Sequence, residues 1–142
     1  MKRQKQLNGS AVEVETAFYD ALNRADIDAL MALWADDEEI VCIHAGGARL
    51  IGHAAVRSSW TSILAGGTLH FRPSQLHETH NLMSSVHTVV EDISAGEGEP
   101  AHQLTTNVYV KTPRGWRIVL HHVSVAPGGA PADAGADAPI LH

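Results

Sequence analysis

The first part of the chain places its apolar residues at helical spacing. Between Val14 and Ala25 they recur every three or four positions, which predicts an amphipathic helix with one buried face. Ser10, with Glu13 three positions later, has the pattern of a capping box at the start of that helix. Asp26 can cap a second helix that follows directly.

A short apolar run then predicts the first strand. Residues 40–44 are continuous and rich in β-branched side chains, and a glycine turn leads from them into residues 48–52. Gly52 precedes a third helix with Trp60 on its apolar face, and Gly66 marks its end.

The rest of the chain predicts strands. Two long strands are expected at 68–80 and 83–94, and two more at 103–112 and 116–127. The sequence "TPRG" at 112–115 suits a type I turn and makes the last pair antiparallel. Three helices beside a mostly antiparallel sheet predict an α+β fold with a cone-shaped, curved sheet wrapped around the helices. A ligand pocket is expected between the two.

Length and composition indicate one domain. The chain has 142 residues, 44% of them apolar, which suits a single core at residues 10–127. Residues 1–9 are polar and are expected to be flexible, and the tail 128–142 is rich in Gly, Ala and Pro and is expected to lie outside the core.

The charge and the single cysteine narrow the possible partners and the compartment. A net charge of −6 argues against nucleic acid or an acidic membrane as partner, because both attract basic surfaces. The sequence contains no apolar run long enough to cross a membrane and no visible signal peptide. Cys42 is the only cysteine, which excludes an internal disulfide and suits a reducing cytoplasm.

Two stretches carry a resemblance to a known superfamily. "AFYDALNRADIDALMALWADD", followed by a strand and a Gly-led helix, resembles the nuclear transport factor 2-like superfamily in its SnoaL-like branch. That group includes ketosteroid isomerases, SnoaL-type cyclases and dehydratases. "GWRIVLHHVSVAP" is similar to the last strand of the association domain of calcium/calmodulin-dependent protein kinase II, through His122, Ser124, Ala126 and Pro127. The resemblance covers about residues 10–127 and implies a cystatin-like α+β roll.

The resemblance to ketosteroid isomerase can be followed residue by residue. Its oxyanion-hole Tyr falls on Phe18, its base on Cys42 and its oxyanion-hole Asp on Asn107. Phe18 cannot donate a hydrogen bond, and a thiol is a poor replacement for a carboxylate base. Steroid isomerisation by that mechanism is therefore not expected. The kinase association domain has an arginine at the position of Asn107, and its absence argues against an anion pocket.

Strand alternation then assigns the faces. If Cys42 and Asn107 face the cavity, so do His44, Thr105 and Tyr109. A regular hairpin across "TPRG" places His122 opposite Thr105, and the inward residues of the last strand would be Ile118, Leu120, His122 and Ser124. The outward row would be Val119, His121, Val123 and Val125, which is the expected homodimer interface.

Two classes of function remain open. The first is an isomerase or lyase that acts on a largely apolar small molecule, with His122 or His44 as acid or base and Asn107 supporting an oxyanion. The expected ligand contacts are Phe18, Trp34, Cys42, Trp60, Thr105, Tyr109, Leu120 and Ser124. The second is a non-catalytic association module, in which these side chains, His122 and Cys42 included, serve packing. No cofactor and no metal is expected. A zinc site from His44, His122 and a third group stays an alternative without the usual ligand spacing.

Overall fold

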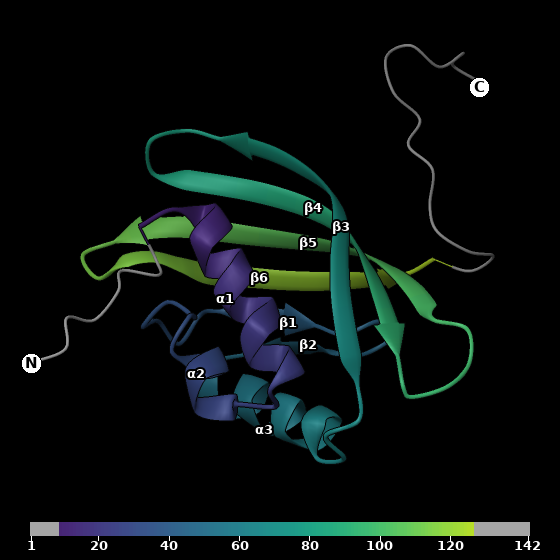
Figure 1. The fold of residues 1–142 in the computed structure, drawn as a ribbon. Helices are drawn as coiled ribbons and strands as arrows, with labels where there is room; N and C mark the ends of the chain where they lie inside the picture. Colours follow the sequence, from purple (N-terminus) through teal and green to yellow (C-terminus); the bar gives the residue numbers. More distant parts are fainter. Residues whose placement is uncertain (1–8, 127–142) are drawn as a thin grey trace, which may run out of the picture.

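The computed structural model describes residues 9–126. The α+β fold is confirmed: three helices pack on one face of a six-stranded sheet (Figure 1). The flexible N-terminal segment up to residue 8 and the tail after Ala126, both predicted from composition, lie outside the described residues.

The first helix forms where the apolar spacing predicts it. α1 spans Ala11–Asn23, and the side chain of Ser10 accepts a hydrogen bond of 3.1 Å from the backbone N–H of Glu13. Its buried face includes Phe18 and Leu22. This face packs against the sheet, which bends around α1 (Figure 1).

The second helix is shorter than expected. α2 spans Ile27–Met31 and begins at Asp26, whose side chain accepts from the N–H of Ala29 at 3.0 Å. Trp34 lies beyond the helix and pairs with Ile118 in an isolated parallel bridge. The backbone therefore leaves the helix to bond with the last strand.

Two short strands and a third helix complete the first half. β1 spans Val41–Ile43, β2 Arg49–Ile51 and α3 His53–Leu64. Gly52 precedes α3 with φ of 93°, a backbone conformation that residues other than glycine rarely adopt. α3 buries Val56, Trp60 and Leu64 against the core.

Four long strands form most of the sheet. β3 spans His70–His80, β4 Ser84–Ser94, β5 Ala101–Thr112 and β6 Gly115–Val125. The strand order is β2-β1-β6-β5-β4-β3; β1 and β6 run parallel, and the other neighbours run antiparallel.

A β-bulge in β6 overturns the predicted faces of the last strand. The hairpin begins as expected, with Thr112 opposite Gly115, but the register shifts after Tyr109 and Ile118. Val119 is the extra residue, so Asn107 pairs with His121. A bulge changes which residues face the core beyond it, because the side chains of a strand alternate.

The consequence is that the two adjacent histidines exchange their expected faces. His121 is 1% exposed and Val123 5% exposed, whereas His122 and Ser124 are exposed on the outer face. Leu120, also predicted to point inward, lies half-buried on the outer face, opposite Val108.

The predicted interface row is wrong for the same reason. His121 and Val123 are buried inside the fold and cannot contact a partner subunit through the outer face. The outer face instead carries apolar side chains from other strands, among them Val86 and Leu104. The homodimer itself stays a prediction.

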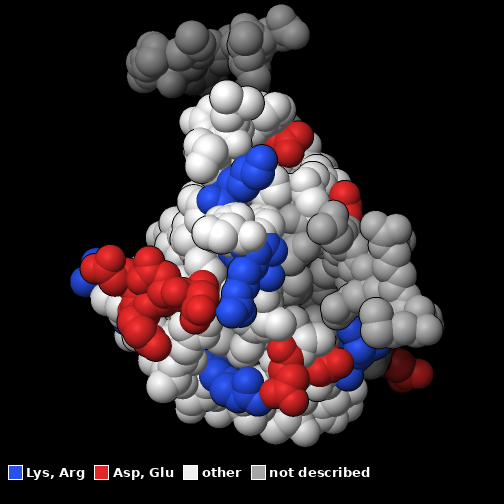
Figure 2. Space-filling model, turned by 90° about the vertical axis from the view of Figure 1, so that its left-hand side faces the viewer, with Lys and Arg blue, Asp and Glu red and all other residues white. Residues whose placement is uncertain are grey.

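One face of the molecule shows mixed charge. On the face in Figure 2, Lys and Arg side chains are interrupted by Asp and Glu side chains and by uncharged residues. None of the described helices has both the length and the apolar character needed to cross a membrane.

Candidate functional site

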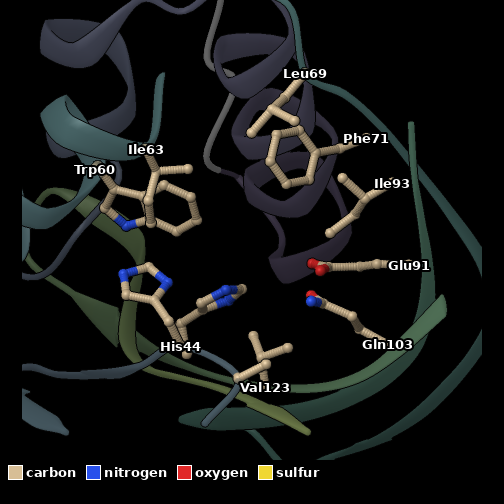
Figure 3. Close-up of a pocket in the computed structure, with 11 residues that line it drawn as sticks. His44, Trp60, Ile63, Leu69, Phe71, Glu91, Ile93, Gln103 and Val123 are labelled. Carbon is tan, nitrogen blue, oxygen red and sulfur yellow. The ribbon is translucent and has the colours of Figure 1, made fainter. Parts of the chain in front are cut away.

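A cavity of about 250 Å³ opens between α3 and the inner face of the sheet. Its wall is mostly apolar and aromatic, with four polar side chains (Figure 3). The lining residues are His44, Ala45, Trp60, Ile63, Leu69, Phe71, Glu91, Ile93, Gln103, His121 and Val123. A wall of this composition, with a few polar groups, is typical of a small-molecule site.

Glu91 places a carboxyl group in this apolar cavity. It lies on β4 and is 2% exposed, and the Tyr19 hydroxyl donates to its Oε2 at 2.5 Å. Burial raises the pKa of Glu91 above its usual range, and the negative charge of Glu15 adds to that, while the hydrogen bond from Tyr19 opposes it. The nearby Thr105 hydroxyl also opposes the rise, although it makes no hydrogen bond of good geometry among the described residues.

Gln103 stands beside Glu91. The two residues are directly paired across β4 and β5, so their side chains leave the sheet on the same face. Figure 3 shows both side chains reaching into the cavity from the wall opposite His44. The cavity therefore has one wall that carries a carboxyl and an amide.

His121 is buried on the other wall. Its Nδ1 lies 2.6 Å from Oδ1 of Asn107, and its ring packs against the rings of Phe18 and Trp60, with centroids 5.2 and 5.6 Å away. Burial lowers the pKa of His121 to about 3, with smaller effects from His44 and His122. The imidazole is therefore neutral near pH 7.

His44 adjoins His121 at the end of β1. Its Nε2 lies 3.0 Å from Oγ of Ser59, and its ring meets the Trp60 ring edge-on with centroids 4.7 Å apart. Burial lowers the pKa of His44, so this ring also favours its neutral form. His44 lines the cavity, on the side that strand alternation assigned to it.

Cys42 lies next to His44 but has little nucleophilic character. Its Sγ is 3.6 Å from His44 Nε2. Burial, with a smaller effect from Glu91, raises the pKa of the thiol to about 12, so the thiolate is scarce near neutral pH. Cys42 fits the reading of a small buried side chain.

Other residues that were predicted to contact a ligand lie behind the cavity wall, in the core or in a separate polar cluster. Phe18 and Asn107 are buried behind His121 and do not line the cavity, and Trp34 lies in the core. Thr105 and Tyr109 face inward as predicted. Tyr109 donates to Glu15 at 2.7 Å and so belongs to a different cluster.

That cluster is a buried polar network joining α1 to the sheet. His87 lies 2.7 Å from Glu15 through Nδ1 and 2.9 Å from Glu78 through Nε2. Burial works to lower the pKa of His87, but the hydrogen bonds and charges of the two carboxylates raise it overall. These side chains satisfy one another.

Sequence reasoning missed Glu91, Gln103 and the role of His121. The signal for Glu91 was present, because Val89, Glu91 and Ile93 alternate along the strand that was expected at 83–94. This alternation puts a carboxyl on an apolar face. For His121, the missing information was the position of the bulge.

The described residues do not support the zinc site that was considered from the sequence. Among residues 9–126, no three or more His, Cys, Asp and Glu side chains are grouped so as to hold a metal ion. His44 faces the cavity and His122 the outer surface, so the zinc hypothesis that paired them is wrong.

Comparison with known proteins identifies the family. Residues 12–127 match the SnoaL-like domain. The chain belongs to the SnoaL-like family. This family is part of the nuclear transport factor 2-like superfamily. A comparison of this SnoaL-like chain with curated proteins finds no match.

Solved structures agree on the fold of this SnoaL-like protein. A candidate calcium/calmodulin-dependent protein kinase type II association domain from Thiobacillus denitrificans ATCC 25259 is 34% identical, with a TM-score of 0.76, over 86% of this chain and 99% of that one. A candidate dehydratase from Streptomyces avermitilis is 30% identical, with a TM-score of 0.72, over 81% and 92%. A cystatin-like protein of unknown function from Nostoc punctiforme, 14% identical with a TM-score of 0.71 over 82% and 88%, shares the fold alone.

Proposed function

We propose that the cavity binds a small, largely apolar carbonyl compound and moves a proton at the carbon next to its carbonyl group. Glu91 would be the proton acceptor and donor in place of the expected His122. The observation that carries the proposal is a carboxyl of raised pKa in an apolar cavity. A general base works best when its pKa lies near the working pH, which burial of a carboxyl achieves.

Gln103 would assist by binding the carbonyl oxygen. Its side-chain amide can donate a hydrogen bond, and its pairing with Glu91 sets the two groups side by side. When Glu91 removes the proton, negative charge develops on the carbonyl oxygen, where an amide donor stabilises it. The proton moves to Glu91 and the electron pair of the C–H bond moves into the enolate.

The same arrangement supports a lyase reaction. The carbon β to the carbonyl can carry a hydroxyl group. Glu91 can then return its proton to that hydroxyl oxygen, and water leaves as a double bond forms between the α and β carbons. The similarity to a candidate dehydratase that is 30% identical is in keeping with this class of reaction.

The proposal predicts hydrogen exchange at carbon. Benzylacetone has an apolar body and exchangeable protons beside its carbonyl, so the protein should accelerate its deuterium uptake in D₂O, followed by NMR. Glu91→Gln should slow the exchange by about 10²-fold or more, because it removes the base. Gln103→Leu should slow it by about 10²-fold through loss of the oxyanion donor.

The matched control is Glu97→Gln, which changes an exposed glutamate in the loop after β4. It should leave the exchange rate as in the wild type. Exchange no faster than in buffer, or equal rates for wild type and Glu91→Gln, would contradict the proposal.

A second candidate function is association of copies of the chain. It is favoured by the similarity to a candidate kinase association domain and by exposed apolar side chains on the outer face, such as Val86 and Leu104. Such a module would use the outer face of the sheet, so the two functions are compatible.

A further inference from the structure

The hydrogen bonds around His44 determine which of its ring nitrogens carries the proton. Ser59 Oγ donates its only proton to the carbonyl oxygen of Val56 at 2.8 Å, so it can only accept from His44 Nε2 at 3.0 Å. This arrangement favours a proton on Nε2, for which Cys42 Sγ at 3.6 Å is a second acceptor, and it leaves Nδ1 of the neutral ring with a lone pair.

The same reasoning applies to His121. Its Nδ1 faces Oδ1 of Asn107 at 2.6 Å, and a carbonyl oxygen only accepts, so Nδ1 carries the proton. Nε2 is then an acceptor, and no hydrogen bond within residues 9–126 occupies it.

The orientation of the Asn107 amide decides this tautomer, because an amide turned the other way would present its nitrogen to His121. In the structure Oδ1 lies toward His121, and Nδ2 makes no hydrogen bond of good geometry among the described residues. The proton on Nδ1 of His121 is therefore the part of the inference that a tautomer measurement tests.

The two histidines thus form one wall with lone pairs and no spare donor. Their ring centroids lie 6.5 Å apart, and both residues line the cavity. A carboxylate ligand would meet these lone pairs and the carboxyl of Glu91, which is unfavourable. An ammonium ligand would be attracted by these groups, but it would have to leave water for a mostly apolar and aromatic cavity, which costs more for a full charge than for a neutral hydroxyl group.

We propose that the pocket selects an uncharged compound whose hydroxyl group donates a hydrogen bond to the wall formed by His44 and His121. With the carbonyl oxygen at Gln103 and the carbon next to the carbonyl at Glu91, the substrate class is a β-hydroxy carbonyl compound on an apolar body. The position of the ligand's carbonyl group rests on the proposed function. The position of its hydroxyl group rests on the tautomers of His44 and His121. The cavity of about 250 Å³ limits the ligand to a small molecule.

Binding of a matched set of compounds tests the selection. Dissociation constants would be measured by NMR titration for β-hydroxybenzylacetone, benzylacetone, hydrocinnamate and the amine analogue of benzylacetone. The hydroxy ketone should bind about fivefold to tenfold more tightly than benzylacetone, which is what one hydrogen bond contributes. Equal or tighter binding of benzylacetone, of the amine or of the carboxylate would overturn the inference.

Substitutions of the histidines identify the side chain that accepts the hydrogen bond from the ligand's hydroxyl group. His121→Phe keeps an aromatic ring but removes the lone pair, so the preference for the hydroxy ketone should fall to about one third or less of its wild-type value. The matched control is His122→Phe on the outer face, which should keep the full preference. A preference unchanged in both His121→Phe and His44→Phe would place the hydroxyl elsewhere.

A measurement on the wild-type protein requires no variant to fold. Long-range ¹H–¹⁵N NMR spectra distinguish imidazole tautomers, and they should report a proton on Nε2 of His44 and on Nδ1 of His121. The opposite tautomer at His121 would overturn the inference.

Glu91→Gln separates this inference from the proposed function. It should slow carbon exchange by about 10²-fold or more yet keep the preference for the hydroxy ketone. If the wild type prefers the hydroxy ketone but does not catalyse hydrogen exchange at carbon, only the proposed proton transfer is refuted.

Discussion

At the scale of single residues, His121 and His122 have opposite surroundings although they are adjacent. Strand alternation predicted that the two would point to opposite faces of the sheet, and that separation is confirmed. The assignment of the two faces was wrong because one extra residue, Val119, shifts the register. No local signal in "RIVLHHVSV" marks this bulge, since the stretch contains no Gly or Pro and is rich in Val and Ile, which suit a regular strand.

The buried His121 should make the protein sensitive to acid. Its pKa is lowered from 6.5 to about 3 in the fold, so between these values the unfolded chain binds a proton that the folded chain does not. Stability is therefore lost as the pH falls through this window, by about 2 kcal/mol between pH 7 and pH 5.

Urea unfolding at these two pH values measures that loss. In His121→Phe the acid-dependent loss should be smaller by about 2 kcal/mol, whereas His122→Phe should behave as the wild type. Equal acid sensitivity of His121→Phe and the wild type would show that His121 binds its proton as readily in the folded chain as in the unfolded one, contrary to a lowered pKa.

At the scale of elements, helices and hairpins were accessible to sequence reasoning, but contacts between distant elements were not. The cap at Ser10 and the "TPRG" turn are local features, and both predictions are confirmed. The pairing of Glu15 on α1 with His87 on β4 depends on how the helix crosses the sheet. The spacing of the sequence contains no such information.

The ion pair of Glu15 with His87 should weaken as the pH rises. Because the pKa of His87 is raised in the fold, its stabilising contribution is complete below the ordinary value of 6.5 and is lost as the pH passes the raised value. Glu15→Gln should destabilise the protein by about 3 kcal/mol at pH 6, and by clearly less at pH 9. Urea unfolding checks this, with Glu97→Gln as control; an equal cost at both pH values would contradict it.

At the scale of the whole molecule, the fold was predictable because its signals repeat along the chain. Helical spacing, strand alternation and the resemblance of residues 10–127 agree, and the SnoaL-like family and α+β architecture are confirmed. The site was only partly predictable: His44 and Trp60 line the cavity as expected, while Glu91 enters it from a strand whose faces had not been assigned.

Association through the outer sheet face is the prediction at this scale. Leu104→Glu should shift the sedimentation coefficient toward that of a monomer, because it places a charge in the apolar interface. Val12→Glu on α1 is the matched control, since Val12 and Leu104 are both 43% exposed, and it should leave the assembly unchanged. A Leu104→Glu protein that sediments as the wild type would move the interface elsewhere.

The pH dependence of carbon-proton exchange in benzylacetone tests the central role of Glu91 most directly. The rate catalysed by the wild type should rise with pH as Glu91 loses its proton, through an apparent pKa above the ordinary glutamate value of 4.5, and then level off. Glu91→Gln should remove this protein-dependent rise. A rise that persists in Glu91→Gln, or a profile that follows the buffer rate at every pH, would contradict the assignment of Glu91 as the proton-transfer group.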